Sequence, residues 1–347
     1  MNPNQLLQLP EELRSLIDAV CHRRLHKVPP HLLTEANLTL PLMDNATCLH
    51  FAAENRQLKH IPPAILCAKN LNRHGEHGWT VLHLAATTGC LDQVPREELN
   101  AANLTKLDDI GGTPLHRAAH FGCLKQVPLE VLTEKNLNIQ RDSGRSIIHV
   151  AALHQHLDQV PLACLTERSL SLPDNDGNTP LHVAAVKGCL AQLPAAVLKP
   201  HLFAIPNREG MTAAFVAIFN GHFHQLPGAL QPAILTQPDP LEQNTALHLA
   251  AAVGRLNRVP AKLLSEENFR RQNGAKQTVF HMAAKHGTLR QIPARLLTVE
   301  NLRLTDAEDV SVMDMAVYHD CTDQIPASIR KSLQSEPGYH PTNCVNA

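Results

Sequence analysis

The sequence predicts an all-α fold, a helical solenoid of stacked turn-helix-helix repeats. Three columns of residues lead to this class. Prolines recur every 33 residues from Pro29 to Pro326, and seven histidines follow the same step with two interruptions. Ten alanines keep the 33-residue spacing without exception, at Ala19, Ala52, Ala85, Ala118, Ala151, Ala184, Ala217, Ala250, Ala283 and Ala316. A fixed period of this length indicates supersecondary units that stack to share one continuous core.

Residues 1–40 are predicted to form an N-terminal capping helix, or degenerate repeat. Leu13, Leu16, Ile17 and Val20 have the spacing of one helix face. The residues of the repeat motif are replaced by other residues in this segment. Terminal units of a solenoid face water on one side, so departure from the pattern is expected at the end of the array.

Residues 41–331 contain nine repeats, and each begins with a turn and a first helix. In one copy Gly177 supplies the turn, and Thr179-Pro180 opens the helix. A threonine hydroxyl can cap free backbone N–H groups, and proline suits the first helical position because it lacks an N–H. The helix is expected to end at Gly188, a residue suited to the left-handed C-terminal position.

The second half of each repeat is built around the proline column. Seven of the ten prolines have glutamine two residues earlier, as in Gln126-Val127-Pro128. Because proline starts helices but breaks their interiors, a second helix is predicted from Pro128 through Leu132, after an irregular turn. An asparagine such as Asn136 follows. It either bonds backbone groups of its own turn and of the next repeat, or is a solvated turn residue.

Residues 200–240 are the least regular repeat. Phe215 replaces the histidine, and further phenylalanines and prolines gather nearby. Two alternatives follow: the repeat packs larger side chains, or the solenoid bends near residues 200–240. Residues 332–347 are predicted to be a C-terminal tail.

The first-helix motif resembles the ankyrin repeat. It is carried by Thr113-Pro114-Leu115-His116 with Ala118-Ala119 and Gly122, and by the copies that start at Thr179 and Thr245. The resemblance covers roughly residues 13–331. It departs from the family in the second helix, where the Gln-Val-Pro segment and an Asn-Leu ending stand. The resemblance implies stacked turn-helix-helix units in a curved array, with protein binding on the concave side.

Composition argues against several classes of function. The net charge is −1 and charged residues make up 18% of the chain, which does not favour nucleic acid or an anionic membrane as partner. No apolar run reaches the roughly 20 residues of a membrane span or resembles a secretory signal. Nine cysteines without a CxxC pair are interpreted as reduced thiols. A cytoplasmic location is expected, with delivery into a host cell left open.

The twenty-two histidines suggest a metal site, but seven of them belong to the repeat motif. Their imidazoles are expected to bond the capping threonine turn and to connect adjacent repeats. No two-Cys, two-His spacing indicates zinc, so no metal and no cofactor is predicted. Neither a phosphate-binding glycine loop nor a converging nucleophile and base is found, so the chain is predicted not to be an enzyme.

Partner binding is therefore predicted for residues at positions where the repeated motif does not fix the amino acid. In ankyrin-like repeats the turn tips and the last residues of the first helix face the groove. Large apolar side chains exposed there mark interaction sites, and tryptophan is enriched among binding hot spots. The predicted partner-binding residues are Trp79, Ile110, His120, Phe121, Leu153, His154, Val186, Lys187, Met211, Phe219 and Val253.

These positions predict a non-catalytic scaffold or adaptor that binds a partner protein on its concave groove. The alternative is a regulatory or inhibitory subunit of an enzyme complex. The chain is expected to be a monomer, with no nucleic acid and no membrane among its partners.

Overall fold

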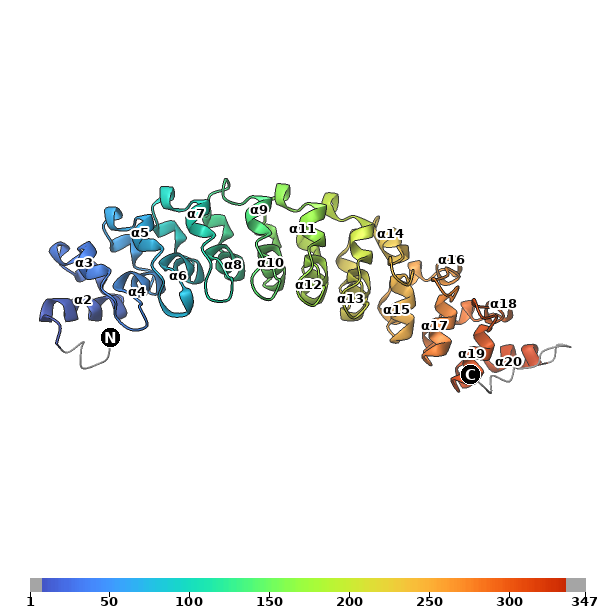
Figure 1. The fold of residues 1–347 in the computed structure, drawn as a ribbon. Helices are drawn as coiled ribbons and strands as arrows, with labels where there is room; N and C mark the ends of the chain where they lie inside the picture. Colours follow the sequence, from blue (N-terminus) through green and yellow to red (C-terminus); the bar gives the residue numbers. More distant parts are fainter. Residues whose placement is uncertain (1–7, 335–347) are drawn as a thin grey trace. The chain divides into compact units, whose positions relative to one another are not determined.

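The computed structural model describes residues 8–334 and divides into two compact units, Met1–Asn175 and Asp176–Ala347. Within each unit, the longer helices form one row and short helical segments form a second row (Figure 1). No β-strand forms among the described residues, where β-type pairing is limited to isolated bridges such as His74–Thr80. The predicted all-α repeat fold is therefore confirmed.

The long helices of the N-terminal unit begin with α2, in which Leu16 and Val20 are buried as their spacing predicts. Residues 1–7 of the predicted cap lie outside the described residues. The row consists of α2 (Glu11–Cys21), α4 (Cys48–Glu54), α6 (Val81–Thr88), α8 (Pro114–His120) and α10 (Ile147–Leu153). In the C-terminal unit it consists of α12 (Pro180–Lys187), α13 (Ala213–Asn220), α15 (Ala246–Ala252), α17 (Val279–Lys285) and α19 (Val312–Tyr318).

The start of most of the long helices is fixed by the predicted threonine and histidine. In α8 the backbone N–H of Thr113 donates to Nδ1 of His116 over 3.2 Å, and the backbone N–H of His116 donates to the Thr113 hydroxyl. Since Nδ1 accepts, Nε2 carries the proton, and it donates to the carbonyl oxygen of Arg145 at 3.2 Å. The histidine thus connects its own cap to the next repeat, as predicted.

The second row does not contain the helix predicted from the proline onward. Residues 128–132 form a single turn, with Val131 N–H donating to the Pro128 carbonyl. Val127 is extended before the proline, and a new cap at Thr133 starts α9. The second helix is therefore reduced to short turns and one-turn helices: α3 (Glu35–Leu38), α5 (Ala68–Leu71), α7 (Ala101–Leu104), α9 (Glu134–Leu137), α11 (Glu167–Ser171), α16 (Glu266–Phe269) and α18 (Val299–Leu302).

Polar side chains at fixed repeat positions replace the contacts that a longer second helix would make. Gln126 accepts a hydrogen bond from the Leu91 N–H and donates to the Gly89 carbonyl, both in the preceding repeat. Asn136 donates to the Val131 carbonyl, so the asparagine bonds its own turn. The repeated asparagines contact a neighbouring repeat through side chains and not through its backbone. For example, the Asn72 side chain donates to the side-chain oxygen of Asn103.

The irregular repeat at 200–240 packs larger side chains, the first of the two alternatives. Phe203 and Phe223 are fully buried, and Phe215 is buried in the slot that holds histidine elsewhere. A six-residue helix, α14 (Gln231–Thr236), takes the place of the one-turn helices. The bend near residues 200–240 stays a prediction.

The described chain ends in α20 (Ala327–Gln334). Residues 332–334 of the predicted tail therefore belong to this helix, and residues 335–347 lie outside the described residues.

Candidate protein-binding surface

The sequence-predicted residues lie on turn tips and at the ends of the long helices, in both units. Trp79, Ile110, His120, Phe121, Leu153 and His154 belong to the N-terminal unit, and Val186, Lys187, Met211, Phe219 and Val253 to the C-terminal unit. Ile110 is 51% exposed on a turn tip whose carbonyl accepts the N–H of Asp142 in the next turn. Backbone bonding thus holds these tips in a regular row.

Three rings form a stack in the N-terminal unit. The imidazole of His120 lies between Phe121 and His154, with ring centroids 4.3 Å and 3.7 Å away and nearly parallel planes. Phe121 remains 46% exposed. Burial, and the positive charge of Arg117 and Arg141, lower the pKa of His120, so the ring is neutral near pH 7. We refer to Phe121, His120 and His154 as the ring stack.

Trp79 is partly covered by a cation. The guanidinium of Arg117 lies 4.1 Å from the centroid of the indole ring, which is the geometry of a cation–π contact. The same guanidinium lies 3.3 Å from the carboxylate of Asp108, whose side chain is fully buried. Trp79 is therefore half-buried on the surface of the repeat and is not part of the core.

Sequence reasoning missed Arg117 and Arg141, which lie near these rings, and Arg145, which lies near Arg141. Arg145 lies 3.4 Å from the buried carboxylate of Asp174. Arg141 forms no ion pair with any acidic side chain of the described residues. A signal was present in the sequence, because Arg141 stands 33 residues from both Asp108 and Asp174 and thus replaces an acidic residue of the repeat.

The predicted residues of the C-terminal unit are more dispersed. Val186 and Phe219 are 48% and 43% exposed, and Lys187 is exposed beside Val186. Arg255 lies over the Phe219 ring at 5.1 Å. Met211 is half-buried, and its carbonyl accepts a hydrogen bond from Nε2 of His182. No ring stack comparable to that of the N-terminal unit is found among these residues.

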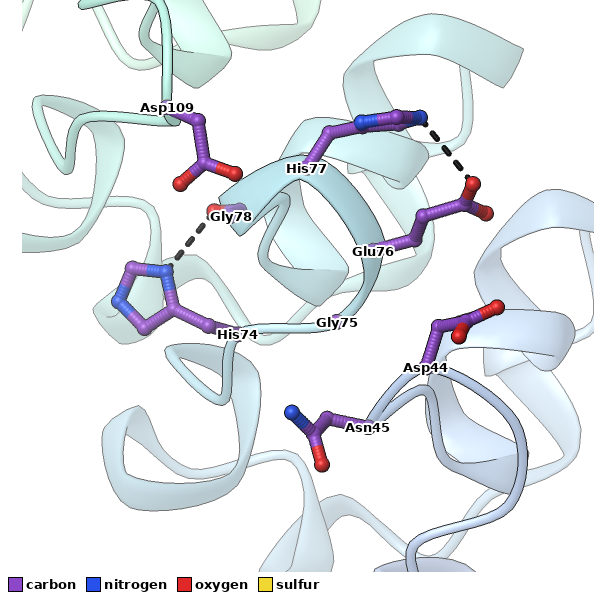
Figure 2. Close-up of a pocket in the computed structure, with 8 residues that line it drawn as sticks. All are labelled: Asp44, Asn45, His74, Gly75, Glu76, His77, Gly78 and Asp109. Carbon is purple, nitrogen blue, oxygen red and sulfur yellow. Dashed lines mark hydrogen bonds and ion pairs between the residues drawn. The ribbon is translucent and has the colours of Figure 1, made fainter. Parts of the chain in front are cut away.

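Figure 2 shows a polar hollow of about 550 Å³ at the turn tips of the first repeats. Within it Nε2 of His77 lies 3.1 Å from the carboxylate of Glu76, and Nδ1 of His74 lies 2.8 Å from the Gly78 carbonyl oxygen. None of the sequence-predicted residues lines this hollow. Its lining consists of Asp44, Asn45, His74, Gly75, Glu76, His77, Gly78 and Asp109.

The cysteine and histidine column has a structural role in this fold. Sγ of Cys123 lies 3.1 Å from the carbonyl oxygen of Ala86 in the preceding repeat, and Nδ1 of His222 lies 2.8 Å from that of Ala185. Burial raises the pKa of the Cys123 thiol to about 12, so it stays protonated and can donate this bond. Within residues 8–334, no three His, Cys, Asp or Glu side chains are grouped so that they could hold a metal ion.

None of the helices between residues 8 and 334 has both the length and the apolar character needed to span a membrane.

Comparison with known proteins places part of this chain in a family. The model described as ankyrin repeats (3 copies) matches residues 115–197, which include α8, α10 and α12. No curated protein matches the chain. Ankyrin repeats generally mediate protein–protein interactions and are typically non-catalytic. The matched helices share their Thr or Ser cap, histidine contact and 33-residue spacing with most of the other repeats, and residues 115–197 consist of ankyrin repeats.

Proposed function

We propose that the chain is a non-catalytic scaffold or adaptor that binds a partner protein on the groove side of its repeats. The observation that carries this proposal is the ring stack with Trp79 beside it. The repeats are held together by bonds of the histidine, glutamine and cysteine columns, none of which needs an exposed phenylalanine or a tryptophan at a turn tip. Aromatic side chains in partly exposed positions supply much of the binding energy at protein interfaces.

The hydrogen-bonded repeats support binding because they hold the exposed apolar and aromatic side chains in fixed positions. Ile110 and Phe121 are held on a bonded turn tip and at a helix end, and the His120 ring is fixed between two neighbours. A preformed surface loses little conformational entropy on binding, so more of the contact energy contributes to affinity. We propose that Val186, Lys187, Met211 and Phe219 provide further contacts from the C-terminal unit.

The proposed location is the cytoplasm, where thiols stay reduced. No cysteine of residues 8–334 is in a disulfide bond, and several of them donate to backbone carbonyls through the protonated thiol. An oxidising compartment would remove those donors. We further propose that the chain acts as a monomer and that its partners include neither nucleic acid nor membrane.

The proposed function is tested by site-specific photo-crosslinking in cells of the source organism. Benzoylphenylalanine replaces Phe121 in one variant and, as matched control, Leu129 in another, since Leu129 is 68% exposed at the proline turn that begins the second half of the repeat. We expect a discrete crosslinked protein from position 121 only. Equal crosslinking from both positions, or none from either, would contradict the proposal. If the captured partner is an enzyme, its activity with and without the chain distinguishes a scaffold from an inhibitory subunit.

A further inference from the structure

The turns before several of the long helices share a hydrogen-bonding arrangement that the turn of Arg141 lacks. In four repeats an Asp or Asn side-chain oxygen accepts two backbone N–H groups, two and four residues later. Asp108 accepts from Ile110 and Gly112, and Asn207 accepts from Glu209 and Met211. Asn273 and Asp306 do the same. The fold therefore favours a short oxygen-bearing side chain at this position.

Arg141 occupies that position and cannot accept a hydrogen bond. Its turn has two backbone bonds, from Arg141 N–H to the Arg145 carbonyl and from Gly144 N–H to the Arg141 carbonyl, and the Gln140 side chain donates to the Gly144 carbonyl. The side chain donates from Nε to the hydroxyl of Ser143 at 3.1 Å. The arginine thus replaces a residue type that would accept backbone N–H groups of the turn.

The surroundings of Arg141 compensate its charge only in part, through the more distant carboxylate of Asp108. The two nearby buried carboxylates, Asp108 and Asp174, each have an arginine of their own, Arg117 and Arg145. Burial, followed by the positive charge of Arg145 and Arg117, lowers the pKa of the Arg141 guanidinium. Three cations therefore share two carboxylates in this part of the surface.

This excess charge lies next to the ring stack. The positive charges of Arg117 and Arg141 both act on the His120 imidazole, and the Arg117 guanidinium also covers Trp79. If an anionic group of a ligand bound Arg141, the neighbouring atoms of that ligand would therefore contact the exposed aromatic side chains of the ring stack.

We infer that this surface binds an acidic segment of a partner protein, with an Asp or Glu carboxylate on Arg141 and a neighbouring large apolar side chain against Phe121. The planar guanidinium matches a carboxylate through two parallel N–H···O bonds. An exposed acidic segment can supply both the carboxylate and the apolar side chain within a few residues. Its negative charge is complementary to the positive charge of Arg141. This inference rests on the proposed function and adds the chemistry of the partner.

The test begins with a random peptide library displayed on phage and selected on the full-length chain. We expect the enriched peptides to place Asp or Glu next to Trp, Phe or Leu. The best peptide is then synthesised with a fluorophore, and its affinity is measured by anisotropy for the wild type, for Arg141→Asn and for Arg168→Asn. The Arg141→Asn substitution restores the side-chain oxygen that other repeats have, so this variant should unfold at or above the wild-type temperature.

The expected result is binding roughly tenfold or more weaker for Arg141→Asn, with Arg168→Asn unchanged. Arg168 is an exposed cation on α11, so it controls for the loss of one charge. Affinity should also fall as NaCl rises. Neutral or basic enriched peptides, or binding that survives Arg141→Asn, would overturn the inference and leave the proposed function standing. Failure to enrich any peptide would count against both.

Discussion

The imidazole rings of His120 and His154 stack at 3.7 Å across two neighbouring repeats, with 16° between their planes. His120 is the last residue of α8 and His154 is the residue that follows α10, so the packing of neighbouring long helices brings the two rings together. Phe121 extends the stack, with its ring centroid 4.3 Å from that of His120. This contact joins two repeats through side chains that none of the repeated motifs requires.

The double variant Trp79→Ala and Phe121→Ala should weaken partner binding and leave folding nearly unchanged. Phe121 is 46% exposed, and Trp79 contributes a cation–π contact of about 1 kcal/mol with Arg117. Calorimetric titration with the crosslinked partner and thermal unfolding measure the two effects separately. A drop in the unfolding temperature comparable to that of a core substitution would show that these side chains belong to the core.

The substitution His182→Ala should destabilise the chain by about 2–4 kcal/mol. The buried ring accepts from the Thr179 backbone through Nδ1, and its Nε2 donates to the Met211 carbonyl at 3.0 Å. Truncation leaves the Thr179 N–H without its acceptor, removes one of the two hydrogen bonds to the Met211 carbonyl, and opens a cavity. Chemical denaturation measures the loss, and Lys187→Ala, on the exposed end of the same helix, is the control.

Metal analysis of the His182→Ala protein adds a second readout. We expect the metal content to match that of the wild type. A loss of bound metal in the variant would show that the histidine column has a ligand role and would overturn its structural interpretation.

Stability should fall as the pH drops from 7 to 5. Burial lowers the pKa of His83, His116 and His248 to about 4, whereas an unfolded histidine titrates near 6.5. Below pH 6.5 the unfolded chain therefore binds protons that the folded chain does not. The stabilisation is complete above pH 6.5 and is lost as the pH falls toward 4, at about 2 kcal/mol per histidine by pH 5.

Denaturant titrations at a series of pH values measure this dependence. The variant His248→Asn keeps an acceptor for the cap but does not titrate; a short side-chain oxygen already serves this role in the last repeat, where Asp314 accepts from Ser311. Its stability should change less steeply with pH than that of the wild type. An identical slope would exclude His248 as a source of the effect.

The first half of each repeat could be predicted from sequence because its contacts are local. Thr113 and His116 are three residues apart, and the cap that they form depends on that spacing. The second half could not, because a proline opens a helix or a turn equally well. The hydrogen bonds of Gln126, which connect this half to the preceding repeat, are not visible in local sequence spacing.

The candidate surface was likewise predictable from sequence only in part. Trp79 and Phe121 could be selected as large apolar residues at positions that face a groove in such repeats. The role of Arg141 depends on what Asp108 and Asn207 bond at equivalent positions, and the spacing alone does not show those bonds.

The cysteine column gives the last prediction: Cys123→Ser should be tolerated better than Cys123→Ala. The thiol is buried, with Sγ 3.1 Å from the Ala86 carbonyl oxygen, and a serine hydroxyl can donate the same bond. The equivalent position 288 already holds a threonine, whose hydroxyl donates to the Ala251 carbonyl. Alanine would remove the donor and leave the Ala86 carbonyl with only its bond from the Gly89 N–H, at a cost of about 0.5–1.5 kcal/mol. Thermal unfolding of the two variants under reducing conditions measures the difference. If alanine were the better replacement, the apolar packing of sulfur would outweigh the hydrogen bond, and the column would have to be described as core alone.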